Sequence, residues 1–438
     1  MYVANETTIR NQTVREEIRF RTHDSGLPVY FCRKPGFQKR YACFATNYGS
    51  MDLRFRPGSG EIIEVPDGIA HFLEHKVFER EDGNALELFS RRGASCNAYT
   101  SFSVTNYLFS CNDHFFDNLD LLIEFVLTPY ITDDNVEKEK GIIGQEIKMY
   151  DDKPGWRSFR NLLEVLYQRH PVRRDIAGTV DSIARIDRNA LYECHRAFYQ
   201  PNNMILFGIG DEAPEEFFDY ADRSLSRFPQ WRSQPLAVRD FPEEPTTVGR
   251  EDITQFMEVS MPRLLLGIKD RVDHEPGPRL LAQELLTDIL LEIVFGRGSS
   301  FYERLYEREL VDDTFAVGYS RYREIGFSTL GGDSPDPDAL ASELVAEMER
   351  VRRDGVTRED FERQKRSGMG SFIRHFSSLE FTANNFCLYQ FGGVNLFDAI
   401  DILHGLRFED LTKRIEQHFQ PSAVARSIIQ PRASAAAP

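Results

Sequence analysis

Residues Asp67–Arg80 read DGIAHFLEHKVFER and place two of the chain's ten histidines four residues apart. Apolar residues recur at helical spacing through this stretch, and the Pro-Asp-Gly signal at its start is typical of a helix N-terminus. Side chains four residues apart lie on one face of a helix, so His71 and His75 are predicted to present both imidazoles to one ion. This spacing suits zinc.

Glu74 directly precedes the second histidine and lies near the same helix face but displaced from it. It is therefore predicted to hydrogen-bond a reacting water without binding the metal, as a general base does. A catalytic zinc ion has three protein ligands and one open position. A third ligand must come from another part of the chain.

The segment VEKEKGIIGQEIKMYDD, residues 136–152, is the best source of that ligand, because Glu139 and Glu146 are nearly two helical turns apart. One carboxylate is predicted to bind zinc and the other to orient a histidine from behind. Four apolar residues surround Glu146: Ile142, Ile143, Ile147 and Met149. They predict a buried carboxylate, which favours a bound cation.

The second half of the chain repeats the first in outline, as strand, helix, strand, helix, helix. HFLEHKVF at 71–78 aligns with ILLEIVF at 289–295, so Ile289 and Ile293 stand where the first half has histidines. Only the first half is predicted to bind metal. The predicted divisions are a zinc-bearing domain at 1–230, a proline-rich linker at 231–250, a homologous domain without metal at 251–430 and a disordered tail at 431–438.

Composition narrows the classes of partner. The formal charge of −16 and the absence of long Lys/Arg runs argue against nucleic acid and an anionic membrane. The N-terminus is too polar for a signal peptide, and no run of about 18 apolar residues occurs, so a cytoplasmic location is expected. The six cysteines are widely spaced and are expected to be reduced core residues.

H-x-x-E-H is an inverted zinc-protease motif. Together with GASCNAYTSFSVTNYLF, EKEKGIIGQEIKMYDDKP, HPVRRDIAGTVDSIARI and FYQPNNMILFGIGD, it makes the chain resemble the insulinase/pitrilysin family of zinc metallopeptidases, in particular its short bacterial subunits related to processing peptidases. The resemblance implies an α+β fold of two homologous domains, each a mixed, mostly antiparallel sheet with packed helices. It further implies that the two domains together form one half of a clamshell.

The resemblance also assigns roles. It implies that His71, His75 and Glu146 bind Zn²⁺, that Glu74 is the catalytic base and that Glu139 supports the site from behind. The implied activity is endopeptidase cleavage of peptides or unfolded segments in a closed chamber. Substrate would add as a β-strand beside four residues: Asn97, Ala98, Tyr99 and Thr100.

One departure from the family concerns an Arg/Tyr pair that binds the substrate carbonyl from the domain without zinc. Glu307 and Phe315 align with that pair, although Arg304, Arg308 and Tyr319 are near enough for a shifted alignment to restore it. The expectation is a heterodimer whose homologous partner lacks the zinc motif and supplies the pair, with a homodimer as the alternative. A catalytically inactive scaffold subunit, and a choice between general peptide turnover and maturation of one precursor, stay open.

Overall fold

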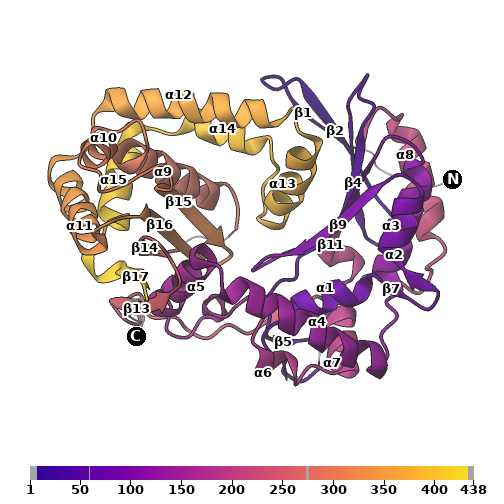
Figure 1. Ribbon diagram of the computed structural model, residues 1–438. Coiled ribbons are helices and arrows are strands. Elements are labelled where there is room, and N and C mark those ends of the chain that lie inside the picture. Colours follow the sequence, from indigo (N-terminus) through magenta and orange to yellow (C-terminus); the bar gives the residue numbers. More distant parts are fainter. Residues whose placement is uncertain (1–6, 59, 273–275, 433–438) are drawn as a thin grey trace.

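Two large sheets lie on opposite sides of the molecule in the computed structural model, which describes residues 7–58, 60–272 and 276–432 (Figure 1). The first sheet has the order β1-β2-β3-β11-β4-β10-β9, and only β3 and β11 are parallel. Its strands are β1 (Thr7–Asn11), β2 (Glu16–Thr22), β3 (Pro28–Arg33), β4 (Arg40–Thr46), β9 (Ser95–Thr100), β10 (Thr105–Cys111) and β11 (Met204–Gly210).

The second sheet repeats the topology of the first. Its order, β13-β17-β14-β16-β15, corresponds strand for strand to β3-β11-β4-β10-β9, including the single parallel pair. Its strands are β13 (Asp252–Met257), β14 (Arg263–Arg271), β15 (Ala316–Tyr322), β16 (Ile325–Asp333) and β17 (Val424–Pro431). The predicted fold class, two homologous α/β domains with mostly antiparallel mixed sheets, is confirmed.

Helices cover one face of each sheet with residues from the same half of the chain. In the first half these are α1 (Ile69–Val77), α2 (Ala85–Arg91), α3 (Phe115–Leu127), α4 (Asp133–Asp151), α6 (Val180–Ile183), α7 (Arg188–Phe198) and α8 (Pro214–Leu225). In the second half they are α9 (Pro278–Phe295), α10 (Ser300–Glu307), α11 (Pro337–Asp354), α12 (Arg358–His375), α14 (Asp398–Gly405) and α15 (Phe408–His418).

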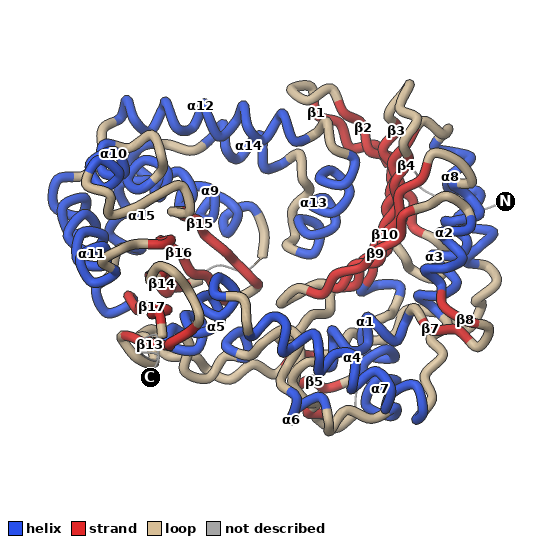
Figure 2. The backbone as a smooth tube through the Cα atoms, in the orientation of Figure 1, coloured by secondary structure: helices blue, strands red, loops and turns tan. Residues whose placement is uncertain are grey.

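The other face of each sheet is covered by a helix from the opposite half (Figure 2). Helix α5 (Pro154–Leu166) packs Leu162 and Leu166 against β14 and β17, while α13 (Leu379–Phe391) packs Phe386 and Cys387 against β4 and β11. Strands covered on both faces are apolar throughout, which explains why every residue of MILFGIG in β11 is buried. Each half therefore has a core of its own, and two further clusters combine residues of both halves.

Short strands and turns complete the chain, and two segments expected to lack regular structure, the linker at 231–250 and the tail from 431, take part in strand pairing. Val238 and Arg239 in the proposed linker form β12, which pairs with β5 (Arg54–Arg56), and β5 in turn pairs with β6 (Ile63–Glu64). Pro431 ends β17 and the Arg432 amide donates to the Met257 carbonyl, so the first two residues of the expected disordered tail are held by the sheet. Residues 433–438 lie outside the described part. The remaining elements are β7 (Glu79–Arg80), β8 (Gly83–Asn84) and three 3₁₀ turns at Pro171–Arg173, Pro201–Asn203 and Pro421–Ala423.

Candidate metal centre

Helix α1 presents the two histidines because its opposite face is apolar. Ile69, Phe72, Leu73 and Val77 are fully buried in the core of the first half, which turns the other side of the helix towards α4 and β9. Gly68 begins the helix at φ 90°, and a Cβ at this position would lie 2.4 Å from the Ala177 carbonyl oxygen. A glycine is therefore required where the chain enters the site.

Helix α4 supplies the carboxylates. Its first turn is held by a capping box, in which Thr132 accepts from the Asn135 amide and the Asn135 side chain accepts from the Thr132 amide. Val136, Ile143 and Ile147 are buried on its core side. Glu139 and Glu146 consequently point at α1, as predicted from their spacing of seven residues.

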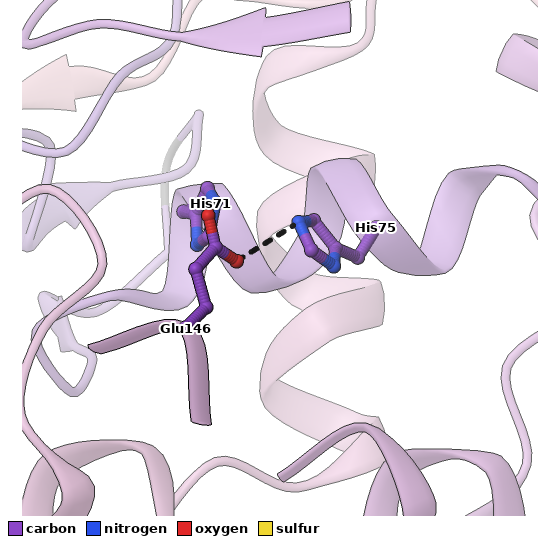
Figure 3. A group of neighbouring side chains, drawn as sticks. All are labelled: His71, His75 and Glu146. Atoms are coloured by element: carbon purple, nitrogen blue, oxygen red, sulfur yellow. Dashed lines mark ion pairs between the residues drawn. The ribbon is translucent and has the colours of Figure 1, made fainter. Parts of the chain in front are cut away.

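His71, His75 and Glu146 come together with their donor atoms facing one another (Figure 3). Glu146 Oε1 lies 3.7 Å from His71 Nε2, and Glu146 Oε2 lies 3.7 Å from His75 Nε2. One ligand atom from each residue lies within 4.8 Å of the others. Two ligands of one tetrahedral zinc ion are about 3.4 Å apart, so the three donors fit zinc with small side-chain adjustments.

The surroundings of Glu146 differ from the prediction. Ile143 and Ile147 are buried, but Ile142 and Met149 are 48% and 51% exposed, and the Glu146 side chain is 25% exposed. The apolar run around Glu146 winds round the helix, so only two of its four members reach the core. Glu146 therefore lies at the edge of the core and is open to solvent.

Glu139 holds His75 from behind. Its Oε1 lies 3.0 Å from His75 Nδ1, and its Oε2 accepts a hydrogen bond of 3.2 Å from Lys76 Nζ. Lys76 is completely buried and Glu139 is 5% exposed. When Nδ1 of a neutral His75 donates to Glu139, Nε2 is left with a lone pair directed at His71 and Glu146, which is the tautomer a metal ligand needs.

Burial and neighbouring charges shift the pKa values of these groups in different directions. Burial, assisted by His75, lowers the pKa of His71 to about 3, so this imidazole is neutral near pH 7. Burial opposes ionisation of His75, but the hydrogen bond to Glu139 and the nearby carboxylates outweigh it and raise the pKa of His75. Burial likewise opposes ionisation of Glu139, yet His75 and Lys76 lower its pKa overall.

Glu74 lies beside the histidines but does not join their ligand group. It is 7% exposed, and its Oε2 accepts a hydrogen bond of 2.6 Å from the hydroxyl of Thr100 on β9. Burial raises the pKa of Glu74 against the opposing effects of Thr100 and His75. A buried carboxylate with a raised pKa is suited to exchange a proton near neutral pH.

A cavity of ≈ 360 Å³ lies over this centre. Its lining includes His71, His75, Glu74 and Glu146. It also includes the four residues predicted to contact substrate: Asn97, Ala98, Tyr99 and Thr100. Strand β9 is the edge of its sheet. Sequence reasoning missed the other lining residues: Tyr150, Trp156, Asp175, Ile176 and Ala177.

The second half contains the same helix pair without the donors. Helices α9 and α12 pack together as α1 and α4 do, and the N-cap threonines Thr132 and Thr357 bring α4 and α12 into register. In that register Gln364 replaces Glu139 and Ser371 replaces Glu146. With Ile289 and Ile293 on α9, no donor of the first site is kept at the matching positions.

The positions expected for the family's Arg/Tyr pair lie on α10 and before β15. Glu307 is exposed, whereas Phe315 is 2% exposed and packs against Tyr302, with the two ring planes tilted by 46°. Of the nearby residues, Arg308 donates to Glu343 at 2.7 Å and the Tyr319 hydroxyl donates to Asp270 at 2.6 Å. Both are engaged within the second half.

Among the described residues, we find no helix that combines the length and the apolar character of a membrane span.

Two family models match the chain. "Insulinase (Peptidase family M16)" matches residues 55–180, and "Peptidase M16 inactive domain" matches residues 185–367. A Bacillus subtilis protein named "Uncharacterized zinc protease YmfH" is 42% identical over 410 residues, which cover 93% of this chain and 95% of that protein. The Helicobacter pylori "Zinc protease PqqE" is 22% identical and covers 87% of each chain.

Solved structures agree with the sequence matches. The crystal structure of a putative M16-like peptidase from Alicyclobacillus acidocaldarius has 35% sequence identity and a TM-score of 0.90, with 99% of each chain covered. Pitrilysin shares the fold at a TM-score of 0.77 and 15% identity, with 98% of this chain matching 47% of that one. These relatives agree with the three donors of the centre and with the repeated sheet topology. The chain belongs to the insulinase family of peptidases, family M16.

Proposed function

We propose that this chain is a zinc metalloendopeptidase that hydrolyses peptides or unfolded polypeptide segments. The convergence of His71, His75 and Glu146 beside the buried carboxylate of Glu74 carries this proposal. The names of curated relatives as zinc proteases support it. Three ligands and a separate acid/base are the parts of a catalytic zinc site, whereas a structural zinc site uses four ligands.

In this proposal His71, His75 and Glu146 hold the zinc ion, and Glu139 keeps His75 in the tautomer that exposes Nε2. Bound zinc would supply a Lewis acid that makes a water acidic near pH 7 and polarises the scissile carbonyl. Glu74 accepts the proton of the attacking water and returns it to the leaving amine, since its raised pKa suits both transfers.

Substrate would lie along the free edge of β9, with main-chain hydrogen bonds to Asn97–Thr100. Strand addition holds many sequences equally well and aligns one peptide bond with the centre. The exposed side chains of Asn97 and Tyr99 and the aromatic wall of Tyr150 and Trp156 are available to contact substrate side chains.

The working unit in this proposal is a dimer that closes around the substrate. In the alignment that places Glu307 and Phe315 at the Arg/Tyr positions, the second half lacks the substrate-binding pair. The proposed partner is therefore a homologous chain that has the pair and lacks the zinc motif. A homodimer is the alternative. Full peptidase activity of this chain purified alone, as a homodimer, would refute the heterodimer.

Glu74→Gln tests the proposed reaction. We expect the variant to bind zinc as the wild type does and to lose cleavage of a quenched fluorescent peptide. Glu292→Gln is the matched control, because Glu292 is the exposed counterpart of Glu74 on α9, and its turnover should equal that of the wild type. Equal turnover of Glu74→Gln would reject the base, and wild-type protein without bound zinc would favour the inactive scaffold.

A further inference from the structure

The pairing of β9 with β10 decides which peptide groups of β9 point to the free edge of the sheet. In the connecting turn the Ser101 amide donates to the Val104 carbonyl, and Thr100 faces Thr105 in the next register position. Hydrogen-bonded and non-hydrogen-bonded pairs alternate along an antiparallel ladder, so the peptide groups of Ala98 and Thr100 point away from β10. The Ala98 amide accordingly donates to the side chain of Asn97, at 2.9 Å.

The side chain of Thr100 points to α1. Its hydroxyl donates to Glu74 Oε2 at 2.6 Å, which is the only hydrogen bond to the Glu74 carboxylate among the described residues. Thr105 lies 3.4 Å from the same hydroxyl, but the Thr105 hydroxyl donates to the Tyr48 carbonyl at 2.9 Å. Thr105 therefore has no proton left for Thr100, and the Thr100 proton goes to the Glu74 carboxylate, which is the nearer acceptor and, when ionised, can only accept.

This arrangement fixes one oxygen of the Glu74 carboxylate. A carboxylate oxygen that accepts a short hydrogen bond from a hydroxyl is held in place, while the other oxygen stays available. Rotation about the last bond of a glutamate side chain is otherwise loosely restricted. Thr100 is the residue that restricts it, and Thr100 belongs to the strand on which substrate is proposed to add.

We propose that Thr100 is a positioning residue for the Glu74 base, in addition to its main-chain contact with substrate. The inference rests on the proposed function. Thr100 joins the substrate edge, through its peptide groups, to the acid/base, through its hydroxyl. A peptide added along β9 would thus contact the same residue that holds Glu74 in the orientation that reaches the reacting water.

Thr100→Val tests the inference, because it keeps the size and branching of the side chain and removes only the donor. We expect kcat for a peptide substrate to fall about 10- to 100-fold, the loss that follows from a misplaced catalytic group. KM should change less than about twofold, since the main-chain contacts remain. Thr100→Ser keeps the hydroxyl and should restore kcat to within about threefold of the wild type.

Three results would overturn the inference: wild-type kcat in Thr100→Val, a loss confined to KM, or loss of zinc from the variant. The last would mark a structural role. Thr100→Ala gives the same comparison if the valine variant does not fold. Glu74→Gln, assayed in parallel, separates the two hypotheses, because an inactive Glu74→Gln with a fully active Thr100→Val rejects the positioning role alone.

A crystal structure of Thr100→Val gives a readout that does not depend on turnover. We expect the Glu74 carboxylate to occupy more than one orientation in the variant and a single one in the wild type. An unchanged single orientation in the variant would overturn the inference, even if the wild-type chain hydrolyses no peptide.

Discussion

Glu139→Gln tests whether zinc affinity depends on a carboxylate that does not touch the metal. Glu139 accepts from His75 at Oε1 and from buried Lys76 at Oε2. Glutamine has nearly the same shape and keeps one oxygen for His75. Its amide group would then face the Lys76 ammonium with donors on both sides, so the variant removes the charge and one acceptor.

The variant is expected to lose zinc affinity and stability, and both losses can be given a magnitude. Loss of a residue that supports a metal-binding histidine lowers metal affinity about 10- to 100-fold, or about 1.4 to 2.7 kcal/mol. Breaking a fully buried ion pair costs about 3 to 5 kcal/mol. Lys76 keeps the Asn135 carbonyl at 3.1 Å and Glu79 at 3.5 Å. The expected loss in free energy of unfolding is therefore smaller, about 1 to 3 kcal/mol.

Competition with a chromogenic chelator measures the zinc Kd, and urea unfolding of the zinc-free protein measures stability. The double variant Lys76→Met/Glu139→Gln is the control, because it removes the unpaired buried charge. It should recover most of the lost stability and keep the weakened zinc affinity. Wild-type zinc affinity in Glu139→Gln would refute the supporting role, and recovered affinity in the double variant would assign the effect to folding.

Two further predictions concern stability. Burial and the neighbouring Glu284 raise the pKa of Asp288 to about 7, so the folded state binds this proton more tightly than the unfolded chain and stability falls as pH rises from about 4 to 7. Asp288→Asn should therefore stabilise the protein by about 2 to 3 kcal/mol more at pH 8 than at pH 5 in urea unfolding; an equal effect at both pH values would contradict this. Removing zinc with a chelator should lower the free energy of unfolding by about 2.7 kcal/mol relative to protein at 100 times the zinc Kd, and Glu146→Ala should abolish the difference. An unchanged melting temperature on chelation would argue against a zinc site.

Local periodicity predicted on which helix faces the four side chains lie. The four-residue spacing of His71 and His75 and the seven-residue spacing of Glu139 and Glu146 each describe one helix, and helix geometry alone puts each pair on one face. The isoleucines of α9 likewise distinguish the two halves by residue type alone. The burial of Ile142 and Met149 was predicted wrongly, since an apolar run does not reveal which helix face meets the core.

Other features depend on contacts between distant segments. Strands β3 and β4 are consecutive in the first domain, yet β11 lies between them, and it arrives about 160 residues after β4. Helices α5 and α13 exchange between halves to cover each other's sheets. An apolar helix face does not identify the surface on which it packs, so sequence periodicity cannot show where such a helix docks.

The sequence by itself determined the residue types and spacings of the centre, because ligand chemistry and helix periodicity are local. The tertiary structure decided which side chains meet: Glu146 faces both histidines, Glu139 reaches His75 and Lys76, and Thr100 reaches Glu74. These contacts join α1 to α4 and β9 across 26 to 75 positions of chain. Side chains so far apart in the sequence meet only when the helices and the strand that carry them pack together in the folded chain.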